Sequence, residues 1–136
     1  MAEFDRGQTF LDLSATNQEG TKGKFFIGLS NADYADDSIV CFVFNTEKRM
    51  DKYHLGCNKE VQKYIVAPGT FSFVSAHSSI MLNQDYCYKL EEMYGDNIKL
   101  LDKADDNLSR QIKNCIDWDY ILPKSALLIK QSFKDN

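Results

Sequence analysis

The sequence lacks any long hydrophobic run, and its longest uncharged apolar stretch covers only residues 39–44. A membrane-spanning helix needs roughly 18 apolar residues, so no such helix is predicted. Residues 1–6 carry mixed charge and no hydrophobic segment follows them, so they do not resemble a signal peptide. We therefore expect the chain to stay in the cytoplasm, without a membrane partner.

Closely spaced cysteines and glycine-rich phosphate loops are also missing. The cysteines stand at wide intervals without a CxxC motif, and we expect free thiols at Cys41, Cys57, Cys87 and Cys115. His54 and Cys57 are three residues apart but have no second close pair, so no metal site is predicted. Neither GxxxxGK[ST] nor GxGxxG occurs, and we expect no nucleotide cradle and no cofactor.

The sequence does contain enough apolar material for one core. It has 136 residues, of which 43% are hydrophobic and 12% aromatic, which excludes a disordered tail and fits a single domain over residues 1–136. The net charge of −4 argues against bulk attraction to nucleic acid. Residues 48–63 nevertheless carry five basic side chains and two acids, a local charge of +3. This segment either attracts a small anion or is a solvated basic loop.

The first two thirds of the chain are typical of short strands. Apolar or alternating segments bounded by turn formers cover residues 9–13, 24–30, 38–45, 64–67, 70–74 and 79–82. A long polar loop, 14–23, separates the first two. Residues 38–45 are apolar on both faces, as expected of a buried central strand in a hairpin with 24–30. Pro68 and Gly69 predict a turn, and residues 86–94 fit a helical turn or a strand.

Helical periodicity replaces the strand patterns in the last third. A first helix is predicted after an N-cap at Asp105 or Asp106, with one apolar face made of Leu108, Ile112, Cys115 and Ile116. A second is predicted with Pro123 in its first turn and an apolar face made of Ala126, Ile129 and Phe133. Five or six strands followed by two helices predict an α+β fold, or a small barrel covered by helices.

A polar cluster follows the predicted central strand, and it is where we place candidate chemistry. It consists of Asn45, Thr46, Lys48, Arg49, Lys52 and His54. Cleavage of RNA without a metal requires a base, an acid and a cation that offsets charge on the phosphorane. Histidine suits proton transfer near neutral pH, and arginine or lysine suits the cationic role. The cluster is therefore compatible with a ribonuclease, and also with an ordinary basic turn.

In the order of these segments the chain resembles the PemK/MazF-like toxin superfamily, over residues 9–116. The resemblance rests on an opening strand and long loop, the segment 24–31, a strand over 37–46 that ends in Thr46, and the segment 77–81 ahead of a C-terminal helix. It implies a small SH3-like β-barrel of five to six strands, usually dimeric. It also implies metal-independent RNA cleavage and control by an antitoxin.

Two positions of the family pattern can be placed on this chain. The family has a basic residue, usually arginine before proline, at the start of its second strand, where Lys24 stands here without a proline. It has a small hydroxyl residue at the end of its third strand, where Thr46 stands, although Glu47 follows where the family tends to have a second hydroxyl. Lysine lacks the bidentate fork with which arginine holds a phosphate, so we expect activity to be weaker, relocated to Arg49 and His54, or absent.

The leading prediction is a toxin-like, metal-independent endoribonuclease that cleaves single-stranded RNA, pairs with an antitoxin and forms a homodimer. Its predicted catalytic residues are Thr46, Arg49 and His54, and its predicted RNA phosphate contacts are Lys24, Lys48, Lys52 and His77. The alternative is a catalytically inactive barrel that binds RNA or a protein. A third possibility is a small enzyme that uses Cys57 as its nucleophile.

Several of these side chains also have purely structural interpretations. His77 can hydrogen-bond within a turn, and the hydroxyl of Thr46 can cap a strand or turn. Four aromatic residues either stack on bases or belong to the core, namely Tyr53, Tyr64, Phe71 and Phe73.

Overall fold

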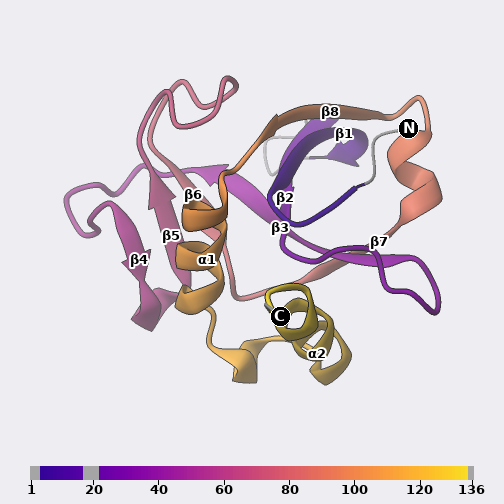
Figure 1. Cartoon of the computed structure of the whole chain (residues 1–136). Coiled ribbons are helices and arrows are strands. Elements are labelled where there is room, and N and C mark those ends of the chain that lie inside the picture. The colour runs from indigo at the N-terminus through magenta and orange to yellow at the C-terminus, as the bar shows by residue number, and fades with distance from the viewer. Residues whose placement is uncertain (1–3, 17–21, 135–136) are drawn as a thin grey trace.

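The computed structural model describes residues 4–16 and 22–134 and has an α+β architecture, as predicted (Figure 1). Its strands are β1 (Gln8–Thr16), β2 (Lys22–Gly28), β3 (Ser38–Thr46), β4 (Gly56–Asn58), β5 (Lys63–Val66), β6 (Ser78–Met81), β7 (Tyr86–Lys89) and β8 (Ile98–Lys103). The helices are α1 (Asp106–Cys115) and α2 (Pro123–Ser132), and short 3-10 turns form η1 (Lys59–Val61), η2 (Leu90–Tyr94) and η3 (Trp118–Tyr120). The described part holds eight strands, so the expected number of five or six is wrong.

Strand β3 is the centre of one antiparallel sheet with the order β4-β5-β6-β3-β2-β1-β8. One edge of β3 pairs with β2, while the other pairs with β7 along its first half and with β6 along its second half. Its residues from Ser38 to Phe44 are all buried, which confirms the expected central strand. Within the described residues β4 and β8 pair on one side only, so hydrogen bonding leaves the sheet open rather than closed into a barrel.

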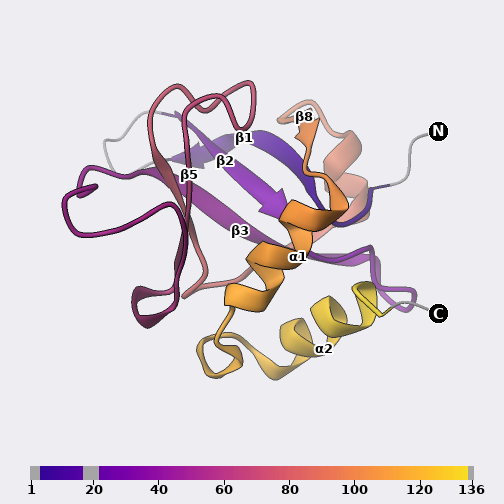
Figure 2. The same cartoon turned by 60° about the vertical axis from the view of Figure 1, so that its left-hand side comes forward.

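The C-terminal helices cover this sheet as their sequence patterns predict. The Asp105 carboxylate accepts the backbone N–H of Leu108 at 2.7 Å, which caps α1, and Ile112 is fully buried. Pro123 begins α2, whose Ile129 is also fully buried. Helix α1 packs against β4 and β5, and α2 packs against β3. Figure 2 shows the two helices next to each other beside β3. The buried residues of both helices therefore join those of the strands in one hydrophobic core.

The segment between β5 and β6 differs from the prediction. The turn at Pro68 and Gly69 is present, with the N–H of Thr70 donating to Ala67 at 3.1 Å and Gly69 at a φ of +86°. Residues 70–74, however, form an irregular loop instead of a strand. Phe71 is buried, and Phe73 stacks on Phe25 with 4.4 Å between ring centroids. The alternating aromatic pattern therefore anchors a loop to the core without pairing to a neighbouring strand.

The bounds of other segments also differ from the predicted ones. Residues 86–94, which fitted two interpretations, contain both: β7 followed by η2. Strands β4 and β8 were not predicted. The predicted loop 14–23 is shorter at both ends, because β1 continues to Thr16 and β2 begins at Lys22; residues 17–21 lie outside the described residues.

A disulfide joins Cys57 of β4 to Cys115 at the end of α1, so the expectation of free thiols is wrong for this pair. The partners are 58 residues apart in sequence, and only the packing of α1 on β4 brings their Cα atoms to 5.5 Å. Cys41 and Cys87 are free, the first buried and the second exposed. Among the described helices, none has the length and apolar character needed to cross a membrane.

Candidate functional site

A small cavity lies where β3 ends, and it contains one of the predicted catalytic residues. We call it the β3 pocket; its volume is about 200 Å³, and its lining consists of Phe25, Phe44, Asn45, Thr46, Phe73, Ser75, Ala76 and Ser78. Thr46 pairs with Ser78 at the start of β6, while Phe25 comes from β2 and Phe73 from the loop 67–77. Three segments distant in sequence therefore meet at the end of the central strand.

The β3 pocket combines aromatic rings with hydrogen-bonding groups. The rings of Phe25 and Phe73 are stacked, and Phe44 meets Phe73 edge-on with 5.2 Å between centroids. The hydroxyls of Thr46, Ser75 and Ser78 supply donors and acceptors to the same lining. Such a lining can hold a flat polar group, with a ring face against aromatic carbon and its edge against hydroxyls.

Glu47, which sequence reasoning missed, fixes the chain immediately after Thr46. Its side chain is only 5% exposed and accepts hydrogen bonds from Lys63 Nζ at 2.9 Å and Ser79 Oγ at 2.7 Å. Its other carboxylate oxygen accepts the backbone N–H of Arg49 at 3.1 Å. The signal for this anchor was an acid directly after a buried strand, at the start of a basic segment. Its two side-chain partners are 16 and 32 residues away, so the sequence does not identify them.

Burial opposes ionisation of Glu47, but the hydrogen bonds from Lys63, Ser79 and the Arg49 N–H outweigh it and lower the pKa of its carboxyl. Because the folded pKa lies below the unfolded value near 4.5, the stabilisation is fully present above that pH and is lost as the pH falls through the folded pKa.

The substitution Glu47→Gln is expected to lower the free energy of unfolding by about 1–2 kcal/mol at neutral pH, because Lys63 then keeps a weaker, uncharged acceptor. The difference from the wild type should shrink below about pH 4.5, where the wild-type carboxylate also becomes protonated. Urea unfolding at a series of pH values measures this, with the exposed Glu91→Gln as the matched control. A difference that stays constant down to acid pH would contradict the role of Glu47.

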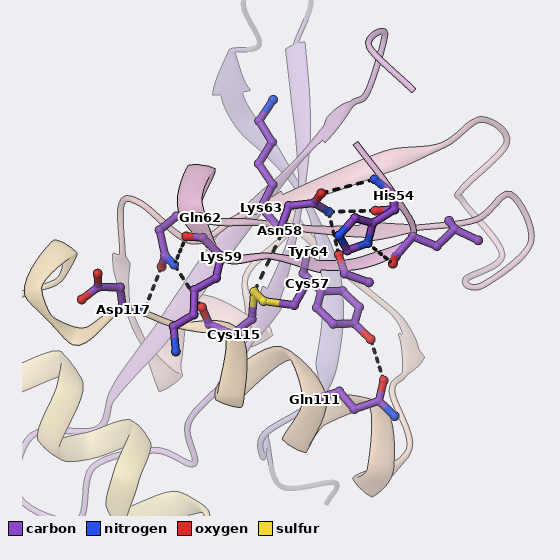
Figure 3. Close-up of a disulfide and its surroundings, with 12 residues drawn as sticks. His54, Cys57, Asn58, Lys59, Gln62, Lys63, Tyr64, Gln111, Cys115 and Asp117 are labelled. Carbon is purple, nitrogen blue, oxygen red and sulfur yellow. Dashed lines mark hydrogen bonds between the residues drawn. A yellow bond between two sulfur atoms is a disulfide. The ribbon is translucent and has the colours of Figure 1, made fainter. Parts of the chain in front are cut away.

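Arg49 and His54, the other predicted catalytic residues, are not among the residues that line the β3 pocket. The exposed guanidinium of Arg49 pairs with Asp51 at 3.3 Å. His54 is exposed, and its ring Nδ1 lies 2.9 Å from the carbonyl oxygen of Leu55 (Figure 3). Asn58 holds the His54 backbone through bonds of 3.2 and 2.7 Å to its N–H and carbonyl oxygen. A proton on Nδ1 would leave Nε2 as the acceptor in the neutral ring.

The predicted phosphate contacts are spread over the same end of the sheet. Lys24 precedes Phe25 on β2, and since successive strand side chains point to opposite faces, Lys24 points away from the β3 pocket. Lys48 and Lys52 are exposed in the loop after β3. His77 is half-buried, and its carbonyl oxygen accepts the Glu47 N–H at 2.8 Å, so its backbone lies beside the chain that follows Thr46.

The alternative interpretations of the aromatic residues are partly resolved. Tyr64 and Phe71 are buried, which confirms their assignment to the core, and Tyr64 donates to Gln111 Oε1 at 2.7 Å. Tyr53 lies beneath Lys63, whose Nζ is 4.6 Å from the ring centroid. Of the four, only Phe73 lines the β3 pocket.

The described residues hold no cluster of metal ligands, and the predicted cysteine nucleophile is blocked. Within 4–16 and 22–134, no group of three or more His, Cys, Asp or Glu side chains could hold a metal ion. Cys57 is joined to Cys115, so its sulfur is not a nucleophile in this state.

Comparisons of the chain with protein-family models, with curated protein sequences and with solved structures found no match. The function is therefore argued from the geometry of the chain itself.

Proposed function

We propose that the β3 pocket binds a base of single-stranded RNA and that the chain acts as an RNA-binding module. The observation that carries this proposal is the shared lining of aromatic rings and hydroxyls around Thr46 and Phe73. Every base has a π-face that stacks on such rings, and its edge can reach the hydroxyls. A volume of about 200 Å³ is below the roughly 300–1,000 Å³ of sites for larger ligands, which suits one base.

Basic side chains beside the pocket would contact the RNA backbone. Lys48, Arg49 and Lys52 follow Thr46 within six residues and are exposed. The pair between Arg49 and Asp51 is exposed as well, and exposed ion pairs contribute only about 0–1 kcal/mol. A phosphate can therefore compete for Arg49 at little cost. This local attraction needs no basic surface elsewhere, which is compatible with a net charge of −4.

Cleavage of the bound RNA is the second candidate function, and Thr46 is the observation that favours it. Its hydroxyl lines the pocket at the strand end where the resemblance to PemK/MazF-like toxins places one. Among the described lining residues, however, no imidazole, guanidinium or carboxylate is present to transfer a proton or offset charge. Binding without cleavage is therefore the function that the geometry supports best.

The proposed relationship to PemK/MazF-like toxins carries further proposals with it. These are an SH3-like arrangement of the strands, a homodimer, an antitoxin partner and a cytoplasmic location. The order of short antiparallel strands around β3 and the helix that follows them support the relationship itself, and the partner and location are proposed only as what that relationship implies.

RNA binding is tested by fluorescence anisotropy of labelled single-stranded RNA in a buffer with chelator. Phe73→Leu should weaken binding about five- to tenfold through lost stacking, and Thr46→Val about fivefold through a lost hydrogen bond. Thr70→Val is the matched control, because Thr70 is exposed on the same loop outside the pocket. Equal affinity of all three variants and the wild type would exclude the pocket as the RNA site.

The same RNA, analysed on a gel after incubation, tests cleavage. Intact RNA supports a binding module. Cutting by the wild type that disappears in a combined Arg49→Ala and His54→Ala variant would instead establish the nuclease and its predicted catalytic residues.

A further inference from the structure

A second and larger cavity lies at the other end of the β5–β6 ladder. The β3 pocket contains Ser78, which pairs with Val66 at the end of β5, whereas this cavity adjoins η1, just before β5 begins. Its volume is about 370 Å³, within the range of small-molecule sites. We call it the Trp118 pocket; its lining consists of Lys59, Lys113, Asn114, Ile116, Asp117 and Trp118.

The walls of the Trp118 pocket are tied together by side chains. Lys59 belongs to η1 and Asn114 to the last turn of α1, and the Cys57–Cys115 disulfide joins the two segments (Figure 3). Gln62 reinforces the tie: its amide nitrogen donates to the carbonyl oxygens of Lys59 at 2.9 Å and of Cys115 at 3.0 Å. A cavity whose walls are already fixed loses little conformational entropy when a ligand binds.

The charge of the lining favours an anion. Within the described residues, neither Lys59 nor Lys113 has a carboxylate within ion-pair distance. Asp117 is the acid among the described lining residues, and its carboxylate accepts the N–H of Asp119 at 3.1 Å. The lining therefore carries two lysines and one aspartate whose carboxylate already has a partner, and the ammonium of Lys113 lies 5.6 Å from the centroid of the Phe133 ring.

Trp118 adds an aromatic surface to these cations. Its indole is partly buried, and the ammonium of Lys130 lies 4.7 Å from its ring centroid. Lysine ammoniums bind phosphate as compact point charges, and an indole stacks well on a nucleobase. The amide of Asn114 can both donate and accept at the edge of a base or sugar.

We propose that the Trp118 pocket binds a nucleotide, with its phosphate on Lys59 and Lys113 and its base against Trp118. The recognised chemistry is a phosphate monoester next to a base, which a free mononucleotide and a 5′-phosphorylated RNA end both present. The site is separate from the β3 pocket and does not depend on RNA binding there.

Trp118 is the single tryptophan of the chain, so its fluorescence reports directly on this pocket. The intact protein is titrated with uridine 5′-monophosphate, uridine, inorganic phosphate and a 5′-phosphorylated trinucleotide. Saturable quenching by the monophosphate identifies a free nucleotide as the ligand, and quenching by the trinucleotide alone identifies an RNA end. Uridine and phosphate, each with half of the contacts, should bind at least about tenfold more weakly.

The variant with both Lys59→Gln and Lys113→Gln should weaken binding by at least about tenfold, because both charge-assisted contacts are lost. Lys99→Gln, an exposed lysine of β8, is the matched control and should bind like the wild type. Three results would each overturn the proposal: no saturable quenching by either phosphorylated probe, an unchanged affinity in the double variant, or inorganic phosphate binding as tightly as the nucleotide.

Discussion

Reduction of the Cys57–Cys115 disulfide is expected to lower the free energy of unfolding by about 4 kcal/mol, the value that chain entropy gives for a loop of this length. The cross-link closes 58 residues of sequence, which include all of β5, β6, β7 and β8. Opening it releases the unfolded chain over that span. It also leaves β4, an edge strand of three residues, held by its pairing with β5 and its packing against α1.

Urea unfolding with and without a phosphine reductant measures this effect. A variant with both Cys57→Ser and Cys115→Ala should unfold at the same low urea concentration in either buffer. Cys87→Ser is the matched control, since Cys87 is an exposed free thiol and its variant should keep the full response to reductant. A response below about 1 kcal/mol in the wild type would show that the cross-link does not restrain the unfolded chain.

The disulfide also bears on the compartment in which the chain works. Stable disulfides are rare in the cytosol and common in oxidising compartments, so the pair is at odds with the cytoplasmic location that we predicted. Alkylation of thiols in intact cells decides the matter. Labelling of Cys57 and Cys115 supports the cytoplasmic prediction, whereas their protection, with Cys87 labelled, points to an oxidising compartment.

The sequence was sufficient to predict those strands and helices whose own residues carry a recognisable pattern. Strand β3 has an uninterrupted apolar run because both of its faces are buried, and α1 carries its own N-cap in Asp105. The prediction failed for strands that form only because a neighbouring strand pairs with them. Strand β4 has the sequence Gly-Cys-Asn, which carries no apolar pattern and is a strand only because β5 pairs with it. Strand β8 was missed because it buries Ile98 alone.

The candidate sites likewise contain residues that a local pattern predicts and residues that only distant contacts bring together. Thr46 was predicted because it stands at the end of the strongest strand, where the resemblance to PemK/MazF-like toxins places a small hydroxyl residue, and it lies in the lining of a cavity. The rest of that cavity comes from Phe25 and the loop that holds Phe73, and the strand predicted for that loop would have placed Phe73 differently. The Trp118 pocket was not foreseen at all, since it depends on η1 meeting the end of α1. Contacts over such separations leave no local pattern in one sequence.

Gln62→Leu is expected to destabilise the protein by about 4 kcal/mol, because the carbonyl oxygen of Cys115 and the N–H of Asp117 lose their hydrogen-bond partner, each at a cost of about 1–3 kcal/mol. The Gln62 side chain is almost fully buried, and besides its two donor bonds it accepts the N–H of Asp117 at 2.8 Å (Figure 3). Leucine has a similar size to glutamine, and both side chains pay the same steric cost at the left-handed φ of +55° found here. The variant therefore isolates the loss of the amide.

Urea unfolding measures the effect of Gln62→Leu, and Gln84→Leu is its matched control because Gln84 is exposed between β6 and β7. Gln62 and the disulfide hold the same two segments together, so their contributions should not be additive. In the Cys57→Ser and Cys115→Ala background the cost of Gln62→Leu should differ from its cost in the wild type by more than about 0.5 kcal/mol. Strict additivity, or a loss below about 1 kcal/mol in the wild type, would mean that α1 is held on the sheet by apolar packing around Ile112 instead.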